Sequence, residues 1–212
     1  MARKPKSDVS LKLLVLGAPG TGKTRFIERY CRSSFHSTEI GDVTIKTMKI
    51  KGIRFTISFW DTSSKQLIPP PGNTSPTSFV ARGSHGAIVL YDITNAKSLD
   101  DVVPDVEQFV STTGSETKLV LVGNKSDLAV ESRAVSIKDA GEFARHHKMV
   151  GVLEVSAKKN RGFEQVMDLL LDSIYRDMNT KSTEMSVKVE RTYDPDLDSH
   201  GVRSRSKCTC TL

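Results

Sequence analysis

The stretch LKLLVLGAPGTGKTRF, residues 11–26, decides the fold. Leu11–Gly17 is apolar apart from Lys12, as expected of a strand that is buried in a parallel sheet. The glycine-rich turn that follows leads into Lys23–Arg32, where Phe26, Ile27 and Tyr30 recur at helical spacing. The sequence therefore predicts a buried strand, a tight turn and a helix in immediate succession.

The turn itself, Gly17 to Thr24, matches the pattern G-x-x-x-x-G-K-[ST] between strand and helix. Backbone N–H groups in such a loop point at phosphate oxygens, assisted by the helix N-terminus. Lys23 would neutralise the β and γ phosphates and stabilise charge during phosphoryl transfer, and the Thr24 hydroxyl would reach Mg²⁺. An ordinary glycine turn is the alternative, and the strand–turn–helix context argues against it. The candidate ligand-binding residues here are Gly20, Thr21, Gly22, Lys23, Thr24 and Arg25.

Apolar runs alternate with helical patterns along the rest of the chain. This alternation predicts an α/β protein with a six-stranded, mostly parallel sheet and helices on both faces. In such sheets, ligands bind outside the carboxyl ends of the strands. Besides the first strand, the expected strands are residues 44–50 and 53–61, forming a hairpin around Gly52, and 87–91, 118–123 and 151–155; the later helices are 99–110, 137–147 and 163–178.

Three segments fall outside that alternation. Residues 66–78, QLIPPPGNTSPTS, hold four prolines and predict an irregular loop. Residues 1–10 are expected to be a flexible basic N-terminus. Residues 179–212 are polar and without periodicity, which predicts a disordered tail. One domain is thus expected over residues 11–178.

The net charge of +6 in 212 residues is concentrated at the two ends. Residues 1–12 carry +3 and residues 201–212 another +3. Such ends suit an anionic membrane surface better than a face that reads nucleic-acid bases, and a solvated tail without a partner is the alternative. Three cysteines are too few for a disulfide scaffold, which favours a reducing compartment. No apolar run approaches the roughly 18 residues of a membrane span, so neither a signal peptide nor a transmembrane helix is expected.

Two later segments indicate which base is bound. Asn124, Lys125, Ser126 and Asp127 follow the strand at 118–123. A carboxylate at that place can accept hydrogen bonds from both N1–H and the 2-amino group of guanine, whereas adenine offers neither in that geometry. A bidentate pair discriminates bases by about 1–3 kcal/mol. Residues 154–158, EVSAK, end the next strand, so a backbone N–H of their loop can meet the guanine O6.

Five motifs in order give a specific resemblance over about residues 10–178. They are GAPGTGKT (17–24), WDT (60–62), RGSHGAIVLYDIT (82–94), GNKSD (123–127) and EVSAK (154–158). With them the chain resembles a small GTPase of the Ras superfamily, most of all its Rab branch. The resemblance implies a monomeric GTP- and GDP-binding switch with Mg²⁺, acting in trafficking or signalling in the cytosol and on the cytoplasmic face of membranes. Its switch regions would bind effector and regulatory proteins, and it would bind no nucleic acid.

The resemblance also implies roles for individual residues. Asn124 and Asp127 would recognise guanine and Lys125 would pack along the base. Asp61 would hold Mg²⁺ through water, and Thr38 would be the switch threonine that senses the γ-phosphate and contacts the metal. The loop that supports the base would consist of Ser156, Ala157 and Lys158.

The second switch departs from the family pattern D-T-A-G-Q-E, because residues 61–66 read DTSSKQ. Ser64 stands where a glycine senses the γ-phosphate, and its Cβ obstructs a close backbone approach. Lys65 stands where a glutamine orients the attacking water, and an ammonium cannot accept a proton. Gln66 would replace that glutamine only if the loop were shifted by one residue. The sequence therefore predicts slow hydrolysis; the alternative is a GTP-bound scaffold without hydrolysis.

The first switch is short. In the family an aromatic at the place of Phe35 packs on the guanine, and the switch threonine follows about seven residues later. Here Thr38 follows after three, and three extended residues span at most about 10 Å. The segment is taut if both residues keep their family roles, and a core position at the helix end is the alternative for Phe35.

The end of the chain, KCTCTL, resembles the region where Rab proteins carry geranylgeranyl groups. The candidates for lipidation are Cys208 and Cys210, and two lipid chains would anchor the protein stably. Two residues follow Cys210, however, and Thr209 occupies the fourth position from the end, so the C-a-a-X rule fails. Unmodified thiols are the alternative.

Overall fold

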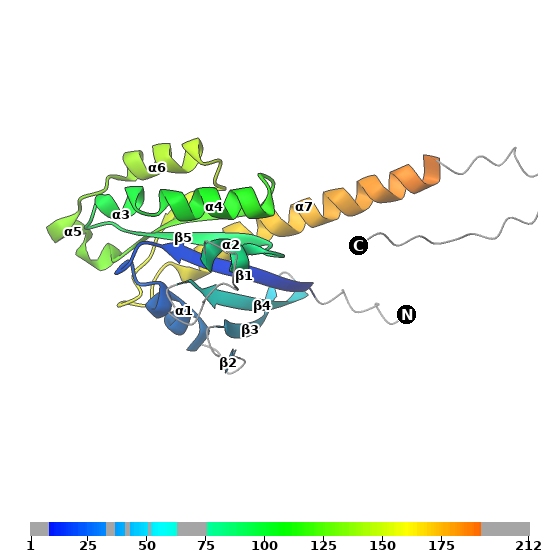
Figure 1. Ribbon diagram of the computed structural model, residues 1–212. Coiled ribbons are helices and arrows are strands. Elements are labelled where there is room, and N and C mark those ends of the chain that lie inside the picture. Colours follow the sequence, from blue (N-terminus) through cyan, green and yellow to red (C-terminus); the bar gives the residue numbers. More distant parts are fainter. Residues whose placement is uncertain (1–8, 33–36, 41–42, 51, 63–75, 192–212) are drawn as a thin grey trace, which may run out of the picture. The chain divides into compact units, whose positions relative to one another are not determined.

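The protein was analysed as a computed structural model, which describes residues 9–32, 37–40, 43–50, 52–62 and 76–191 (Figure 1). These residues form a seven-stranded sheet in the order β2-β3-β4-β1-β5-β6-β7. All pairs from β4 through β1 and β5 to β7 are parallel, and β2, β3 and β4 pair antiparallel. The strands are β1 Val9–Gly17, β2 Ser37–Ile40, β3 Val43–Ile50, β4 Ile53–Asp61, β5 Gly86–Asp92, β6 Lys118–Asn124 and β7 Val152–Glu154.

The six predicted strands are all present, which confirms the mostly parallel α/β architecture. The prediction missed β2, a four-residue strand that extends the sheet at the β3 edge and places Thr38 opposite Ile45. β1 also begins earlier than expected: Val9 and Ser10 pair with Phe55 and Thr56 of β4. The expected flexible N-terminus therefore overlaps the first strand by two residues.

Seven α-helices and one 3-10 helix lie among the described residues. They are α1 Lys23–Arg32, α2 Pro76–Ala81, α3 Lys97–Asp100, α4 Val103–Thr113, η1 Ser126–Leu128, α5 Ala129–Ser132, α6 Ile137–His146 and α7 Phe163–Arg191. The expected helices at 23–32, 137–147 and 163–178 correspond to α1, α6 and the first part of α7.

Proline explains two corrections to the predicted helices. The single helix expected over 99–110 is wrong, because α3 ends at Asp100 and α4 begins at Val103. Pro104 lies in the first turn of α4, where a helix tolerates a residue without an N–H, so a new helix starts there. The irregular loop expected over 66–78 is wrong at its end, because α2 begins at Pro76, with proline at the first helical position.

The last helix continues past Met178, where a disordered tail was expected, and ends at Arg191. Residues 179–191, NTKSTEMSVKVER, contain neither glycine nor proline, and a helix that is already nucleated propagates at little cost. By contact density the chain divides into one unit up to Tyr175 and a second unit from Arg176 onward.

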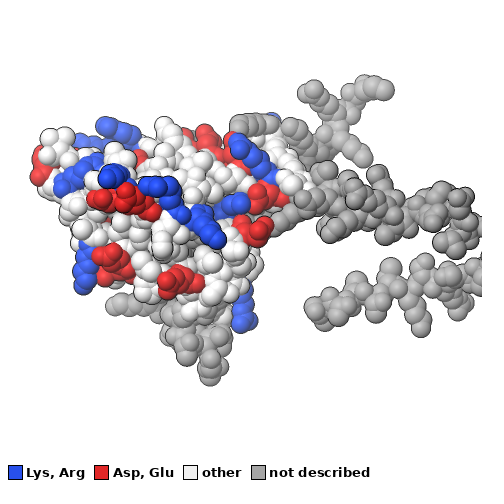
Figure 2. All heavy atoms as spheres, turned by 90° about the horizontal axis from the view of Figure 1, so that it is seen from above, with Lys and Arg blue, Asp and Glu red and all other residues white. Residues whose placement is uncertain are grey.

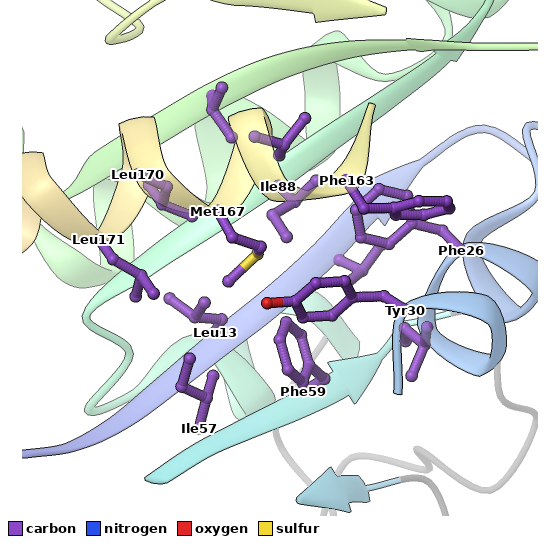
Figure 3. Packing of buried hydrophobic residues seen from close by; sticks show 14 of the residues in the cluster. Leu13, Phe26, Tyr30, Ile57, Phe59, Ile88, Phe163, Met167, Leu170 and Leu171 are labelled. Atoms are coloured by element: carbon purple, nitrogen blue, oxygen red, sulfur yellow. The ribbon is translucent and has the colours of Figure 1, made fainter. Parts of the chain in front are cut away.

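The core has two parts, one on each face of the sheet. Alternate residues of β1 face opposite sides, so Leu13 and Val15 join the part covered by α1 and α7, while Leu14 and Leu16 join the part covered by α2, α4 and α6. Figure 3 shows the first part, in which Phe26, Tyr30 and Phe163 meet. The ring centroids of Phe26 and Phe163 are 5.0 Å apart, so α1 and α7 are packed against each other.

A buried lysine supports the end of α1. Lys46 of β3 donates a hydrogen bond from Nζ to the Tyr30 carbonyl (2.6 Å) and lies 3.6 Å from the centroid of the Tyr30 ring. Burial lowers the pKa of the Lys46 ammonium, with Cys31 and Glu164 acting in the opposite direction. A positive group at the last carbonyls of a helix compensates the helix dipole.

Positive and negative side chains are interspersed on the face that α4 and α6 cover (Figure 2). Three of its ion pairs lie on helix surfaces, at Lys97–Asp101, Lys138–Glu142 and Arg145–Glu142, each with 4.0 Å between the charged atoms. Among the helices of the described residues, none combines the length and apolarity that crossing a bilayer requires.

Candidate nucleotide site

A cavity of about 850 Å³ opens where the glycine-rich loop, the start of α1 and the ends of β6 and β7 meet. This is the carboxyl edge of the parallel strands, where the sequence predicted a ligand. Most of the residues predicted to bind the nucleotide, apart from those of the metal site, line this cavity. Its lining consists of Gly20, Gly22, Arg25, Glu28, Arg29, Asn124, Lys125, Asp127, Leu128, Ala157, Lys158 and Asn160.

The glycine-rich loop leaves β1 at Gly17 and enters α1 at Lys23. Gly22 has a φ of +95°, and a Cβ built on it would lie 2.5 Å from Nδ2 of Asn124. Only glycine allows this approach without displacement. Within the loop, the buried Thr21 donates from Oγ1 to the Ala18 carbonyl (2.8 Å), which closes the turn.

Lys23 is buried inside the loop. Its Nζ donates hydrogen bonds to the carbonyls of Gly17 (2.5 Å) and Ala18 (3.2 Å). Burial lowers the pKa of this ammonium, and the carboxylates of Asp61 and Asp105 oppose that shift. The loop thus holds a cation among its own backbone groups, next to where a phosphate would be bound.

Thr24 and Asp61 are brought together from α1 and the end of β4. The Thr24 hydroxyl donates to Oδ2 of Asp61 over 2.5 Å. A hydroxyl and a carboxylate are hard oxygen donors of the kind that Mg²⁺ prefers, so this pair fits the predicted metal site. Thr38 lies in β2, and its side chain is outside the described residues. Its predicted role at the metal stays a prediction.

Asn124 connects three parts of the site. It is 3% exposed at the end of β6, and its Nδ2 donates to the Thr21 carbonyl (2.8 Å). Its Oδ1 accepts a hydrogen bond from the N–H of Ala157 (3.2 Å). One amide therefore holds the glycine-rich loop, β6 and the loop after β7 in a fixed relation.

Asp127 presents a charged acceptor to the cavity. Ser156 donates from Oγ to Oδ1 of Asp127 (2.6 Å), and Nζ of Lys158 is 3.9 Å from Oδ2. The hydrogen bond from Ser156 holds the pKa of Asp127 below its ordinary value, although burial acts in the opposite direction. A carboxylate that stays ionised can accept two N–H groups from one ligand edge.

Sequence reasoning missed the contribution of α1 beyond Arg25. Arg29 donates from Nε to the Ala157 carbonyl (3.1 Å), and Arg25 pairs with Glu28 (3.0 Å). These three residues have the i, i+3, i+4 spacing of one helix face, opposite the apolar residues of α1. That spacing was the signal in the sequence from which Glu28 and Arg29 could have been predicted. Leu128 and Asn160, which also line the cavity, carry no comparable signal.

Several predicted residues fall outside the described parts of the chain. They are Phe35 at the first switch, Gln66 at the second, and Cys208 and Cys210 near the end. Their predicted roles therefore stay predictions.

A parallel sheet, a glycine-rich loop between its first strand and helix, and a cavity at its carboxyl edge define a P-loop nucleotide-binding protein of the α/β class. Residues 12–176 match the model of the Ras family. The chain is 34% identical over 175 residues to the Ras-related protein RabC of Dictyostelium discoideum, which covers 80% of this chain and 86% of that protein. It is 32% identical over 190 residues to the Ras-related protein Rab-10 of Caenorhabditis elegans, covering 88% and 90% of the two chains. The chain belongs to the Ras family of small GTPases, as its motifs predicted, and it resembles the Rab proteins.

Family membership implies binding of GTP or GDP with Mg²⁺ in general terms. The described geometry is compatible with that ligand. Lys23 is held within the glycine-rich loop, Thr24 and Asp61 form an oxygen pair that fits a metal, and Asp127 lines the cavity.

Proposed function

We propose that this protein is a Rab-like switch that binds GTP and GDP, hydrolyses GTP slowly, and is recognised by effector and regulatory proteins through its switch regions. The observation that supports the proposal is that the ionised Asp127 lines the same cavity as the glycine-rich loop to which Asn124 is bonded. Such a site can bind a ligand that has both a purine and a polyphosphate.

Slow hydrolysis is inferred from residues 63–66 of the sequence. Ser64 and Lys65 replace the glycine and glutamine of the family pattern, and neither a Cβ near the γ-phosphate nor an ammonium near the attacking water assists the reaction. The same two residues favour a second candidate function, a protein that stays bound to GTP and recruits partners as a scaffold.

Base preference and bound nucleotide test the core of the proposal. Isothermal titration of the full chain with GDP and with ADP, both with Mg²⁺, should give heat with GDP and a much weaker response with ADP. Equal affinity for the two would overturn the proposal. Denaturing the purified protein and separating the released nucleotide then discriminates the two candidates, because mostly GDP supports the switch and mostly GTP the scaffold.

Membrane attachment is the second part of the proposal. Cys208 and Cys210 carry lipid chains, and the adjoining Arg203, Arg205 and Lys207 add attraction to anionic headgroups of about 1 kcal/mol each. One chain alone binds marginally, whereas two give a stable anchor for a role in membrane traffic. Intact mass spectrometry of the protein from its native cell should show two isoprenoid adducts, and an unmodified mass would exclude this anchor.

A further inference from the structure

Asp92 stands at the carboxyl end of β5, beside the cavity but outside its lining. In the parallel pairing of β5 with β6, Asp92 lies opposite Asn124. Lys125 is the residue that follows Asn124 in the sequence. Its side chain is 9% exposed. A nearly buried carboxylate requires polar partners, and those partners indicate what Asp92 does.

Both oxygens of the Asp92 carboxylate are engaged. Oδ2 accepts a hydrogen bond from Nζ of Lys125 over 2.5 Å. Oδ1 accepts from the N–H (2.9 Å) and the hydroxyl (2.7 Å) of Thr94. The backbone N–H of Asp92 is in turn bonded to Oγ of Ser98 (2.9 Å). The carboxylate is therefore held in one orientation by the turn after β5.

The charge on that carboxylate is maintained. Burial alone would raise the pKa of Asp92, but the hydrogen bonds from Lys125 and Thr94 outweigh burial, and the pKa lies below its ordinary value. The ammonium of Lys125 thus meets a permanent negative partner at neutral pH.

The partner of this carboxylate lines the cavity. Lys125 has a φ of 67°, in the left-handed region, at the start of η1, and it lies between Asn124 and Asp127 in the sequence. A free lysine side chain of four methylenes samples many rotamers, and ordering it costs conformational entropy. A tether at Nζ removes that freedom before a ligand arrives.

We propose that Asp92 is a positioning residue for guanine binding: it holds Lys125 by the ammonium so that the methylene stem forms a preordered wall of the cavity. The proposal rests on the proposed function, because the ligand in question is a guanine nucleotide. Nucleotide binding then loses no further entropy in ordering this side chain, so the affinity for the nucleotide is higher.

A purely structural role explains the pair less well. β5 and β6 are already joined from Gly86 with Lys118 to Asp92 with Asn124, so the strands need no additional link. A buried ion pair contributes little net stability, because desolvation offsets its attraction. The main effect of the Asp92–Lys125 ion pair is therefore to fix the position of the Lys125 side chain.

A double-mutant cycle on the full chain tests the proposal, with the dissociation constant for GDP with Mg²⁺ as the readout. Asp92→Asn should weaken GDP binding by about tenfold, which corresponds to roughly 1.4 kcal/mol. Lys125→Met keeps the stem but has no ammonium, so adding Asp92→Asn to it should cause less than a twofold further loss. The matched control is Asp101→Asn, which removes the exposed partner of Lys97 and should leave the GDP affinity unchanged.

The outcomes separate the possible failures. If the wild-type chain binds no GDP, the proposed function and this inference both fail. If the wild type binds GDP and Asp92→Asn matches it, only the inference fails. A full tenfold loss also in the Lys125→Met background would mean that Asp92 acts on the fold and not through Lys125. Should Asp92→Asn not fold, Thr94→Val replaces it in the cycle; the inference then requires a loss of about threefold that disappears with Lys125→Met.

Discussion

Gly22 and Asn124 are in closer contact than any side chain at position 22 would permit. The absent Cβ of Gly22 would lie 2.5 Å from Nδ2 of Asn124, the atom that donates to the Thr21 carbonyl. The φ of Gly22 is also in the left-handed region, at +95°. The geometry of the glycine-rich loop and that of the base side of the cavity are therefore linked through one pair of residues.

Gly22→Ala is expected to weaken GDP binding by about tenfold to a hundredfold, because the displaced Asn124 leaves buried polar groups unpaired at roughly 1–3 kcal/mol each. Backbone strain adds about 1–2 kcal/mol to the loss of stability. Gly52→Ala is the matched control: its φ is +82°, but among the described residues no heavy atom outside its chain neighbours lies within 4 Å of the added Cβ. Titration calorimetry with GDP and urea unfolding of both variants separate strain from displacement. Equal GDP affinities for the two variants would contradict the argument.

The carboxylate of Asp127 gives a prediction about pH. Its lowered pKa in the folded protein means that it contributes stability above the ordinary carboxyl pKa of about 3.9, and that this contribution is lost as the pH falls through the folded value. Ser156→Ala removes the largest cause of the shift. Its acid unfolding should therefore occur at higher pH than that of the wild type, with a loss of about 1 kcal/mol at pH 7.

The single tryptophan, Trp60, reports this acid unfolding by fluorescence. Ser136→Ala serves as the control, because Ser136 makes a similar hydrogen bond to Asp139 (2.7 Å) on the exposed start of α6. It should lower stability as a lost helix cap does, by about 1 kcal/mol at every pH, whereas the loss in Ser156→Ala should shrink as the pH falls below the ordinary carboxyl pKa of about 3.9. An identical pH dependence for Ser156→Ala and the wild type would exclude the role given to Ser156.

The sequence allowed the residues of the site to be predicted where they belong to a local motif. It did not allow their contacts with distant parts of the chain to be predicted. The pattern from Gly17 to Thr24 specifies its own loop, and Asp127 follows a predicted strand. The hydrogen bond from Asn124 to Thr21, by contrast, joins residues 103 positions apart, and that from Arg29 to Ala157 joins residues 128 apart. Such bonds depend on strand order and helix docking, which no local spacing contains.

At the level of elements, hydrophobic periodicity predicted most of those that contribute to the core. β1, β5 and β6 are continuous apolar runs, and each was found. The misses are elements without a clear apolar period: α2 has only six residues, although its Val80 and Ala81 are buried. β2 is a short edge strand held by pairing with β3, and the part of α7 beyond Met178 follows from helix propagation rather than from an apolar stripe.

Phe163, the first residue of α7, tests how strongly the packing of α7 against α1 stabilises the core. It is 1% exposed, 5.0 Å from the Phe26 ring centroid and 6.1 Å from that of Tyr30, so it packs α7 onto α1 (Figure 3). Phe163→Ala should lower the free energy of unfolding by about 3–5 kcal/mol, because it removes a buried ring and leaves a cavity. Phe79→Ala, at a side chain in α2 that is 42% exposed, should cost far less. Urea denaturation measures both, and similar losses would contradict the packing argument.

On the scale of the whole molecule, the residues proposed for binding and those proposed for hydrolysis belong to different parts of the chain. Gly22, Asn124 and Asp127 lie on or beside α1 and β6, where Asn124 is bonded to Thr21, the neighbour of Gly22, and Asp127 is bonded to Ser156. Ser64, Lys65 and Gln66 lie in the segment between β4 and α2, outside the described residues. Affinity for the nucleotide and the rate of hydrolysis should therefore respond to different substitutions.

The double substitution Ser64→Gly and Lys65→Gln tests this separation. It returns a glycine N–H and an amide oxygen to the positions that the family pattern assigns to γ-phosphate sensing and to orienting water. The single-turnover rate of GTP hydrolysis should rise roughly tenfold or more, because a group that orients the attacking water is restored. The dissociation constant for GDP should remain within about twofold of wild type, because no residue proposed for GDP binding is changed.

Lys65→Met is the control that separates two causes. It removes the ammonium without supplying an amide, so a rate equal to that of the double variant would mean that the charge of Lys65 alone suppresses hydrolysis. If neither variant exceeds a slow wild-type rate, the block does not reside at positions 64 and 65, and the short spacing between Phe35 and Thr38 becomes the cause to test. If the wild type already hydrolyses GTP at the rate of ordinary family members, the departure at residues 63–66 has no catalytic consequence, and the scaffold without hydrolysis is excluded.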